Sequence, residues 1–145
     1  MKTVPPNVEL LKLAEALESV MPRWVILPQA SRLTSTAWDG DARSTTSPTQ
    51  IDMSAVFGTP TNIDALLLEV YAQDSGAATT DCWIRFNQQT GGGGSTLRVP
   101  PANDRYGCGQ LTVPTDTNGD IFFDCAASGE LTLDVILIVR GYHLR

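Results

Sequence analysis

The spacing of hydrophobic residues changes at Trp24, from a helical period before it to a strand-like alternation after it. The segment from Val8 to Met21 is rich in strong helix formers, and the Pro22 that follows it ends a helix. We therefore predict one helix over residues 8–21. Its apolar stripe has the 3-4-3 spacing of a coiled-coil seam and consists of Leu10, Leu13, Leu17 and Val20.

This stripe needs a packing partner, because a helix of about 14 residues is only marginally stable in water. Three partners are open: the chain's own β domain, another subunit, or a host structure. Terminal segments stay disordered unless something holds them, so the position of the stripe favours contact with another subunit. The four stripe residues are therefore candidates for oligomerisation.

After Trp24, short apolar or alternating runs are separated by Gly, Pro, Asn, Asp and Ser, which is typical of strands joined by turns. Seven or eight such strands predict an all-β fold, an antiparallel β-sandwich or jelly roll, with residues 1–23 as a docking helix and 24–145 as the sandwich domain. The expected strands are Trp24 to Leu27, Thr49 to Met53, Ile63 to Ala72, Cys82 to Asn87, Thr96 to Val99, Gln110 to Val113, Ile121 to Ala126 and Leu131 to Tyr142.

Alternation predicts which side chains point inward. Cys82, Ile84 and Phe86 share one face of their strand, which should be the core face. The last strand is apolar on both faces from Val135 to Val139, so we expect it to be central and covered on both sides, one cover being another subunit. Asn118 and Gly119 form the preferred pair for a type I′ hairpin between the two runs that flank them.

Composition narrows the function classes. The chain of 145 residues is 42% hydrophobic and only 18% charged, which indicates surface hidden in an assembly. A net charge of −6 with no Lys/Arg cluster excludes a basic face for nucleic acid. No apolar run approaches the ~18 residues of a membrane span, and the start lacks the features of a signal peptide, so we expect no membrane insertion. Three cysteines at wide spacings fit no disulfide framework, so we expect synthesis in a reducing cytoplasm.

Catalytic and metal-binding patterns are weak. His143 is the one histidine and has no nucleophile motif near it, and three widely spaced cysteines form no metal clip. We expect Cys82 and Cys125 to be buried hydrophobes, and Cys108, in a loop between two glycines, is open to exposure and reaction. The sequence therefore predicts no enzyme activity and no cofactor.

One acidic loop resembles the start of a calcium site, because it alternates oxygen-bearing side chains around a glycine. Its candidate ligands are Asp116, Asn118 and Asp120. The twelfth position of this loop is Ala127, where a calcium loop of the EF-hand type needs a bidentate Glu. A plain turn is the simpler interpretation.

Several segments are similar to small β-sandwich modules of tailed-bacteriophage virion proteins. They span most of residues 34–142 and comprise the run from Thr36 to Thr46, Ile51 to Pro60, Asp74-Ser75-Gly76, Asn103-Asp104-Arg105, and the ending from Leu131 to Ile136 and Gly141-Tyr142. The resemblance implies a virion component, commonly trimeric, located at tail fibres or as decoration on heads. The N-terminal helix lies outside the resemblance.

The sequence hypothesis is thus a trimeric tail-fibre or tail-associated surface protein that contacts other virion proteins and a host glycan or protein. Aromatic and arginine side chains on loops are good binding anchors. The candidate contact residues are Trp38, Asp39, Arg43, Asn103, Asp104, Arg105 and Tyr106. The alternatives are a capsid decoration protein that stabilises the head and, with the least support, a polysaccharide-degrading enzyme.

Overall fold

Eight strands dominate the part of the chain that the structure describes. The computed structural model describes residues 12, 13, 16, 17, 21–35, 38, 48–76, 82–89, 94–129 and 132–145. In chain order the elements are β1 (Arg23–Ile26), the 3-10 turn η1 (Gln29–Ser31), β2 (Thr49–Ile51), α2 (Met53–Phe57), β3 (Ile63–Asp74), β4 (Cys82–Asn87), β5 (Ser95–Val99), β6 (Gly107–Pro114), β7 (Ile121–Ala126) and β8 (Leu133–Leu144).

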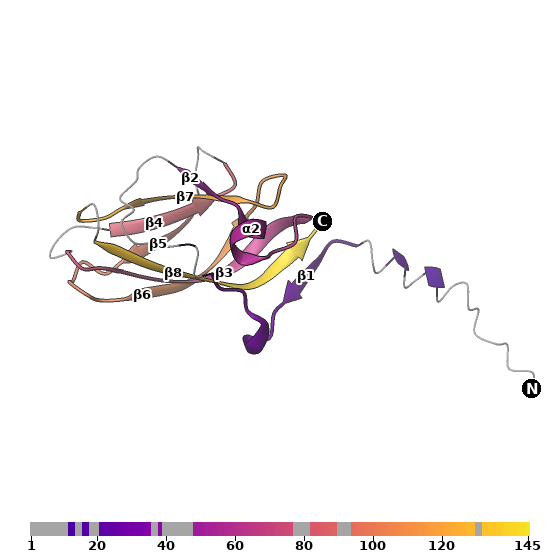
Figure 1. Ribbon diagram of the computed structural model, residues 1–145, viewed down its shortest axis with the longest axis horizontal. Helices are drawn as coiled ribbons and strands as arrows, with labels where there is room; N and C mark the ends of the chain where they lie inside the picture. Colours follow the sequence, from indigo (N-terminus) through magenta and orange to yellow (C-terminus); the bar gives the residue numbers. More distant parts are fainter. Residues whose placement is uncertain are drawn as a thin grey trace, which may run out of the picture.

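The strands form two four-stranded antiparallel sheets that face each other (Figure 1). Sheet A has the order β1-β8-β3-β6 and sheet B the order β2-β7-β4-β5. The first strand therefore pairs with the last, the second with the seventh, the third with the sixth and the fourth with the fifth. This is the order of a hairpin of four strand pairs rolled over on itself, which defines a jelly roll. The predicted all-β sandwich is confirmed.

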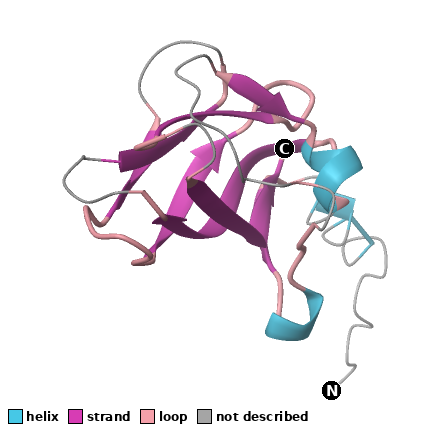
Figure 2. Cartoon of the chain, turned by 60° about the vertical axis from the view of Figure 1, so that its left-hand side comes forward, coloured by secondary structure: helices cyan, strands magenta, loops and turns pink. Residues whose placement is uncertain are grey.

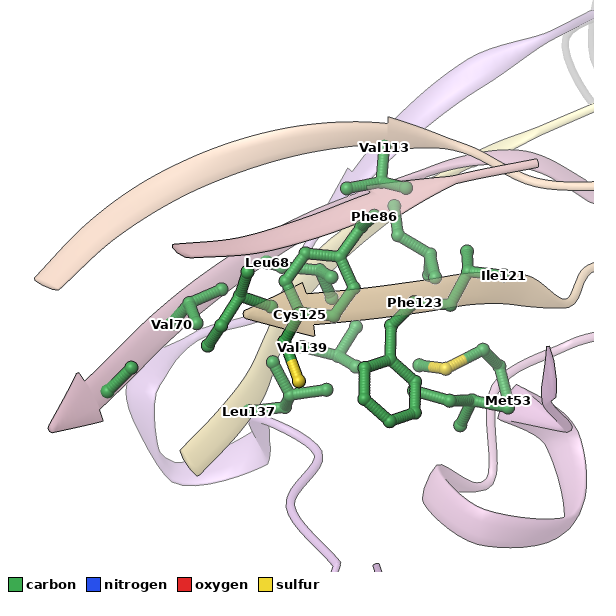
Figure 3. Packing of buried hydrophobic residues seen from close by; sticks show 14 of the residues in the cluster. Met53, Leu68, Val70, Phe86, Val113, Ile121, Phe123, Cys125, Leu137 and Val139 are labelled. Atoms are coloured by element: carbon green, nitrogen blue, oxygen red, sulfur yellow. The ribbon is translucent and has the colours of Figure 1, made fainter. Parts of the chain in front are cut away.

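The core lies between the inner faces of the two sheets. Period-two alternation sends every second side chain inward, so Leu66, Leu68 and Val70 of β3 are fully buried while their neighbours are not. Cys82, Ile84 and Phe86 of β4 are fully buried too, as the sequence predicted. Figure 3 shows the cluster at close range, with side chains from β3, β4, β6, β7, β8 and α2 meeting between the sheets.

A short helix, α2, stands where the sequence predicted the end of a strand, and the placement of Met53 in that strand was wrong. The Asp52 carboxylate accepts a hydrogen bond from the Ala55 N–H at 2.8 Å, which caps the helix. Gly58, with φ +74°, ends it. Met53 and Phe57 face the core from this helix. Figure 2 shows the helical elements to one side of the strands.

The turn at Asn118-Gly119 is present but differs from the prediction. Gly119 has φ +86°, whereas Asn118 does not have the positive φ that a type I′ turn needs. The Gly119 N–H donates to the Asp116 carbonyl, and the Asp116 N–H donates to the Asp120 carbonyl, as in a three-residue turn with a left-handed third residue. The strands that it joins, β6 and β7, belong to different sheets. The turn therefore carries the chain from one sheet to the other.

β8 lies between β1 and β3, so its predicted central position is confirmed. Within the described part of the chain, the outer face of β8 is only partly covered, because Ile136 is 49% exposed. Ile138 on the same face is partly exposed. The described residues therefore leave part of the second apolar face of β8 in contact with solvent.

The N-terminal segment is described at four helical positions, Lys12, Leu13, Ala16 and Leu17. The Met21 N–H donates to the Leu17 carbonyl at 3.1 Å, which continues the helical turn. Leu13 and Leu17 are 56% and 52% exposed. The other two stripe residues, Leu10 and Val20, lie outside the described residues. The described half of the stripe therefore contacts little of its own sandwich.

The two ends of the sandwich differ in what they carry. At one end, Asp74 at the end of β3 lies opposite Leu133 at the start of β8, beside the loop 100–106. At the other end, Leu144 lies opposite both Ile63 and Arg23, where the N-terminal segment joins β1. We call these the loop end and the N-terminal end. Figure 1 shows β1, α2 and the C-terminus together at the N-terminal end.

Gly119 gives a test of the turn between the sheets. A Cβ at this position would lie 3.1 Å from the Ile63 Cγ1 and 3.1 Å from the Thr61 carbonyl oxygen, in a backbone region that L side chains avoid. We expect Gly119→Ala to lower the free energy of unfolding in urea by about 2–3 kcal/mol. The control Gly58→Ala has a similar φ and open space around it, so its loss should be only about 1 kcal/mol. Equal losses would contradict the crowding at Gly119.

Candidate interaction surface

Four of the predicted contact residues lie together on the exposed loop between β5 and β6, at the loop end. They are Asn103, Asp104, Arg105 and Tyr106. Asp104 has φ +55°, a left-handed conformation that Asp tolerates better than most residues. The Asn103 side-chain amide donates to the Asp104 carboxylate at 3.0 Å, and the Arg105 N–H donates to the Ala102 carbonyl at 3.3 Å. The loop is therefore folded on itself and exposes its side chains to solvent.

This loop is attached to the end of β3 by the backbone of Asp74, whose carbonyl accepts from the Asp104 N–H at 3.3 Å. The Asp74 carboxylate is fully buried and is held by four donors. They are the N–H of Ser128 at 2.7 Å, its hydroxyl at 2.5 Å, the N–H of Gly76 at 2.9 Å and the thiol of Cys82 at 3.0 Å. One carboxylate thus ties together three segments of the loop end.

The electrostatics of Asp74 follow from this arrangement. Burial alone would raise the pKa of its carboxyl group, but the hydrogen bonds from Ser128, Cys82 and Gly76 stabilise the charged form more strongly. The pKa of Asp74 is therefore well below its ordinary value. The sequence showed a polar residue before a Ser-Gly turn but not the convergence of donors upon it.

A shallow pocket of about 360 Å³ lies on the outer face of sheet A near the loop end. Tyr71, Tyr106, Ile136 and Ile138 line it, from β3, the β5–β6 loop and β8. Tyr71 and Ile136 are direct partners in the strand register, which explains why two separate elements meet here. Among the predicted contact residues, Tyr106 belongs to this pocket. The sequence missed Tyr71 and the two isoleucines as site residues, although the second apolar face of the last strand pointed to them.

The polar side chains that flank the pocket are bonded to each other. The Tyr71 hydroxyl donates to the Glu69 carboxylate, which also lies 3.4 Å from the Arg32 guanidinium and 3.5 Å from that of Arg140. The hydrogen bond to Glu69 raises the pKa of Tyr71. These polar groups hold one another on the sheet, so they offer little to an incoming polar ligand.

The remaining predicted contacts divide into two groups. Trp38 is partly buried and packs on the core, with its ring 6.4 Å from that of Phe57 and 5.8 Å from that of Phe123. The structure thus gives Trp38 a packing role and places it apart from the β5–β6 loop. Asp39 and Arg43 lie outside the described residues.

The acidic turn uses its carboxylates internally. The Asp116 carboxylate accepts from the N–H groups of Asn118 and Asp120 at 2.8 and 2.9 Å. The Asp120 carboxylate accepts from the Met53 N–H at 3.0 Å and from the Gln50 amide at 2.9 Å. Within the described ranges, no group of three or more His, Cys, Asp or Glu side chains is arranged to hold a metal. The calcium interpretation therefore gains no support from geometry.

His143 is held between two side chains at the N-terminal end. Its Nδ1 lies 2.7 Å from the Asp64 carboxylate, and its ring meets the edge of Trp24 at 5.3 Å between centroids. These contacts fasten β1, β3 and β8 together. They give the histidine a structural role, and neither partner is a hydroxyl or thiol that a histidine base would activate.

The cysteines behave largely as expected. Cys82 and Cys125 are buried, Cys108 is exposed, and none of the three forms a disulfide bond in the described part of the chain. Cys108 lies in β6 and not in a loop, where it is the register partner of Tyr71 on the outer face of sheet A. It therefore stands at the rim of the pocket.

On the outer face of sheet B, Arg85 of β4 forms a bidentate ion pair with Asp124 of β7, its register partner. The Asp124 side chain is almost fully covered, and the guanidinium also lies over the Trp83 ring at 5.2 Å. This pair joins the two central strands of the sheet, β4 and β7.

Comparison with known proteins does not assign the chain to a family. No protein-family model matches the chain, and none of the curated proteins is a match to it. In the described part of the chain, no helix has the length and apolar character needed to cross a membrane.

Asp74 generates a prediction about acid stability. Because its pKa is lower in the folded protein than in the unfolded chain, it contributes stability that is complete above the unfolded pKa, near 3.9, and is lost as the pH falls towards the folded pKa. Asp74→Asn replaces one accepting carboxylate oxygen by an amide NH2 group, which would face the donors that now bond to Asp74. We therefore expect the free energy of unfolding to fall by about 2–3 kcal/mol at pH 7. Urea unfolding between pH 7 and pH 2 measures both effects.

The difference between wild type and Asp74→Asn should be constant from pH 7 to about pH 5 and then shrink as the pH falls further. Asp104→Asn, an exposed control on the neighbouring loop, should stay within ~0.5 kcal/mol of wild type throughout. A pH-independent difference for Asp74→Asn would contradict a buried charged carboxylate.

Proposed function

We propose that the chain is a non-enzymatic structural protein of a tailed-phage virion, a homotrimeric tail-fibre or tail-associated surface module used for attachment or host recognition. It is made in the host cytoplasm and acts in the virion. The N-terminal helix docks or oligomerises the protein, and the sandwich presents the loop end to the host surface.

The observation that carries the proposal is the separation of two different surfaces along one chain. Leu13 and Leu17 stand exposed before β1, at the N-terminal end. Asn103, Asp104 and Arg105 stand exposed on the loop at the opposite end. Twelve-residue strands β3 and β8 connect the two. An apolar attachment surface and a polar display surface at opposite ends suit a protein that is fixed to a particle and faces outward.

The fold agrees with the proposal by analogy. Jelly rolls occur in viral capsid proteins, lectins and cupins, so the architecture fits a virion protein without selecting it over the others. The resemblance over residues 34–142 favours the virion class.

The hydrogen bonds made by the buried carboxylates support a structural role. Asp74, Asp120 and Asp124 are buried, and each carboxylate is bonded to groups of neighbouring segments. A catalytic carboxylate has to face a substrate from a cleft. Each of these three instead joins strands or loops, which supports a protein built for rigidity.

The location in the particle separates tail fibre from head decoration. Purified tails and tail-less heads should be digested and their proteins quantified by mass spectrometry. We expect the chain in the tail fraction at a small multiple of three copies per particle. Recovery with tail-less heads at hundreds of copies would replace the tail proposal with the decoration alternative, and absence from both fractions would remove the virion proposal.

Host contact predicts an effect of the loop side chains. Virions that carry Arg105→Ala should adsorb to host cells about tenfold more slowly, equivalent to ~1.4 kcal/mol, since exposed arginines are frequent binding anchors. Arg23→Ala removes another exposed arginine, at the N-terminal end, and should leave adsorption unchanged. Normal adsorption of the Arg105 variant, together with that of Asn103→Ala, would contradict recognition by this loop.

A further inference from the structure

We propose that the pocket formed by Tyr71, Tyr106, Ile136 and Ile138 is an assembly site that receives the leucine stripe of a second copy of this chain. The inference rests on the oligomeric part of the proposed function and identifies the contact. Leu13 and Leu17 are the described residues of the stripe, and they are the side chains that we expect to enter the pocket.

The chemistry of the pocket fits aliphatic side chains. Two isoleucines and two tyrosine rings line it, and Tyr106 is 54% exposed. The Tyr71 hydroxyl is engaged by Glu69, and Gln73 donates to Asp134 at 2.7 Å just beyond. A ligand rich in hydroxyl groups would find these partners occupied, whereas a leucine removes apolar surface from water at about 25 cal/mol per Å².

The leucine stripe is an exposed apolar surface that complements the pocket. Leu13 and Leu17 are four residues apart and helical, so they project from one face, one turn apart. Both are more than half exposed, and neighbouring apolar side chains on one exposed helix face are typical of an interaction surface. One chain therefore presents an exposed leucine ridge and an exposed apolar hollow.

The stripe of a chain does not fill the pocket of the same chain. Leu13 and Leu17 remain more than half exposed, and the pocket is lined by residues of β3, β8 and the β5–β6 loop. Leu17 is joined to Met21 by a helical hydrogen bond, so it lies within about 13 Å of Arg23, whereas Ile136 is about 26 Å along β8 from the partner of Arg23. We therefore assign the leucines in the pocket to another copy.

A contact between the stripe of one copy and the pocket of another is heterologous, because it joins two different surfaces. Such a contact closes into a ring when the rotation between copies is suitable, and three copies then use every stripe and every pocket.

Cysteine cross-linking tests the contact directly, because the exposed Cys108 stands at the rim of the pocket beside Tyr71. The full chain with Leu17→Cys and Cys108→Ser is mixed with a mass-tagged chain that keeps Cys108 and Leu17, and mild oxidant is added. A disulfide needs Cα atoms within about 7 Å. We expect a bond between positions 17 and 108 of different copies, identified by peptide mass spectrometry.

Lys12→Cys with Cys108→Ser is the matched control, since Lys12 is helical and exposed but lies on another face from Leu17. It should form the bond to Cys108 at least tenfold less. An equal yield from both positions would overturn the inference. So would coupling of position 17 only to position 17 of another copy, which would show a helix bundle and leave the oligomeric proposal standing without the pocket.

A second pair of variants tests whether apolar packing in the pocket is needed to bring positions 17 and 108 together. Ile136→Thr removes the exposed apolar floor while keeping a β-branched residue, and should reduce the 17–108 bond at least tenfold with an unchanged melting temperature. Ile26→Thr makes the same change at a residue of sheet A that is 62% exposed and outside the pocket, and should leave the bond intact. Equal bond formation in Ile136→Thr and wild type would overturn the assignment of the pocket.

Discussion

β3 and β8 are each twelve residues long and pair along almost their whole length, from Ile63 opposite Leu144 to Asp74 opposite Leu133. Their inner side chains fill much of the core, and their outer side chains make the floor of the pocket. This antiparallel pair also sets the distance between the two ends of the molecule. The exposed Leu13 and Leu17 and the pocket consequently lie toward opposite ends of this strand pair.

Buried polar groups in this protein fasten segments together at points where the strand ladder ends. Asp74 collects donors from three segments at the loop end, and Asp120 does the same for α2 and β2 at the N-terminal end. Each would carry a large penalty if left unpaired, so each fixes the geometry around it. Buried hydrogen bonds therefore hold α2 and the segments around Asp74 to the sheets, which suits a structural protein.

Much of the fold could be predicted from the sequence, because alternation is strong where one face of a strand meets the core. The bounds of β4 and β7 were predicted in full, and the central place of β8 followed from its two apolar faces. Helix α2 was missed because five residues are too few to show a helical period. The pairing of β6 and β7 across a turn was misjudged because a turn motif does not reveal which sheet its strands join.

The candidate site was predicted only in part, because the sequence does not show which residues of neighbouring strands lie opposite each other. Tyr106 could be read as an exposed aromatic residue, but its meeting with Tyr71 and Ile136 depends on which residues of β3 and β8 lie opposite each other. Trp38 showed the reverse problem, since an aromatic residue between strands reads as a contact until its packing on Phe57 is known. The sequence left three partners open for the stripe, and the exposure of Leu13 and Leu17 argues against the chain's own sandwich for these two residues.

The central claim is that the apolar surfaces left open in the single chain are covered by other copies. Native mass spectrometry of the unmodified full-length chain tests it most directly. The account predicts a closed assembly with three times the chain mass of 15.6 kDa. A species of one chain mass at every concentration at which the protein remains dissolved would contradict it.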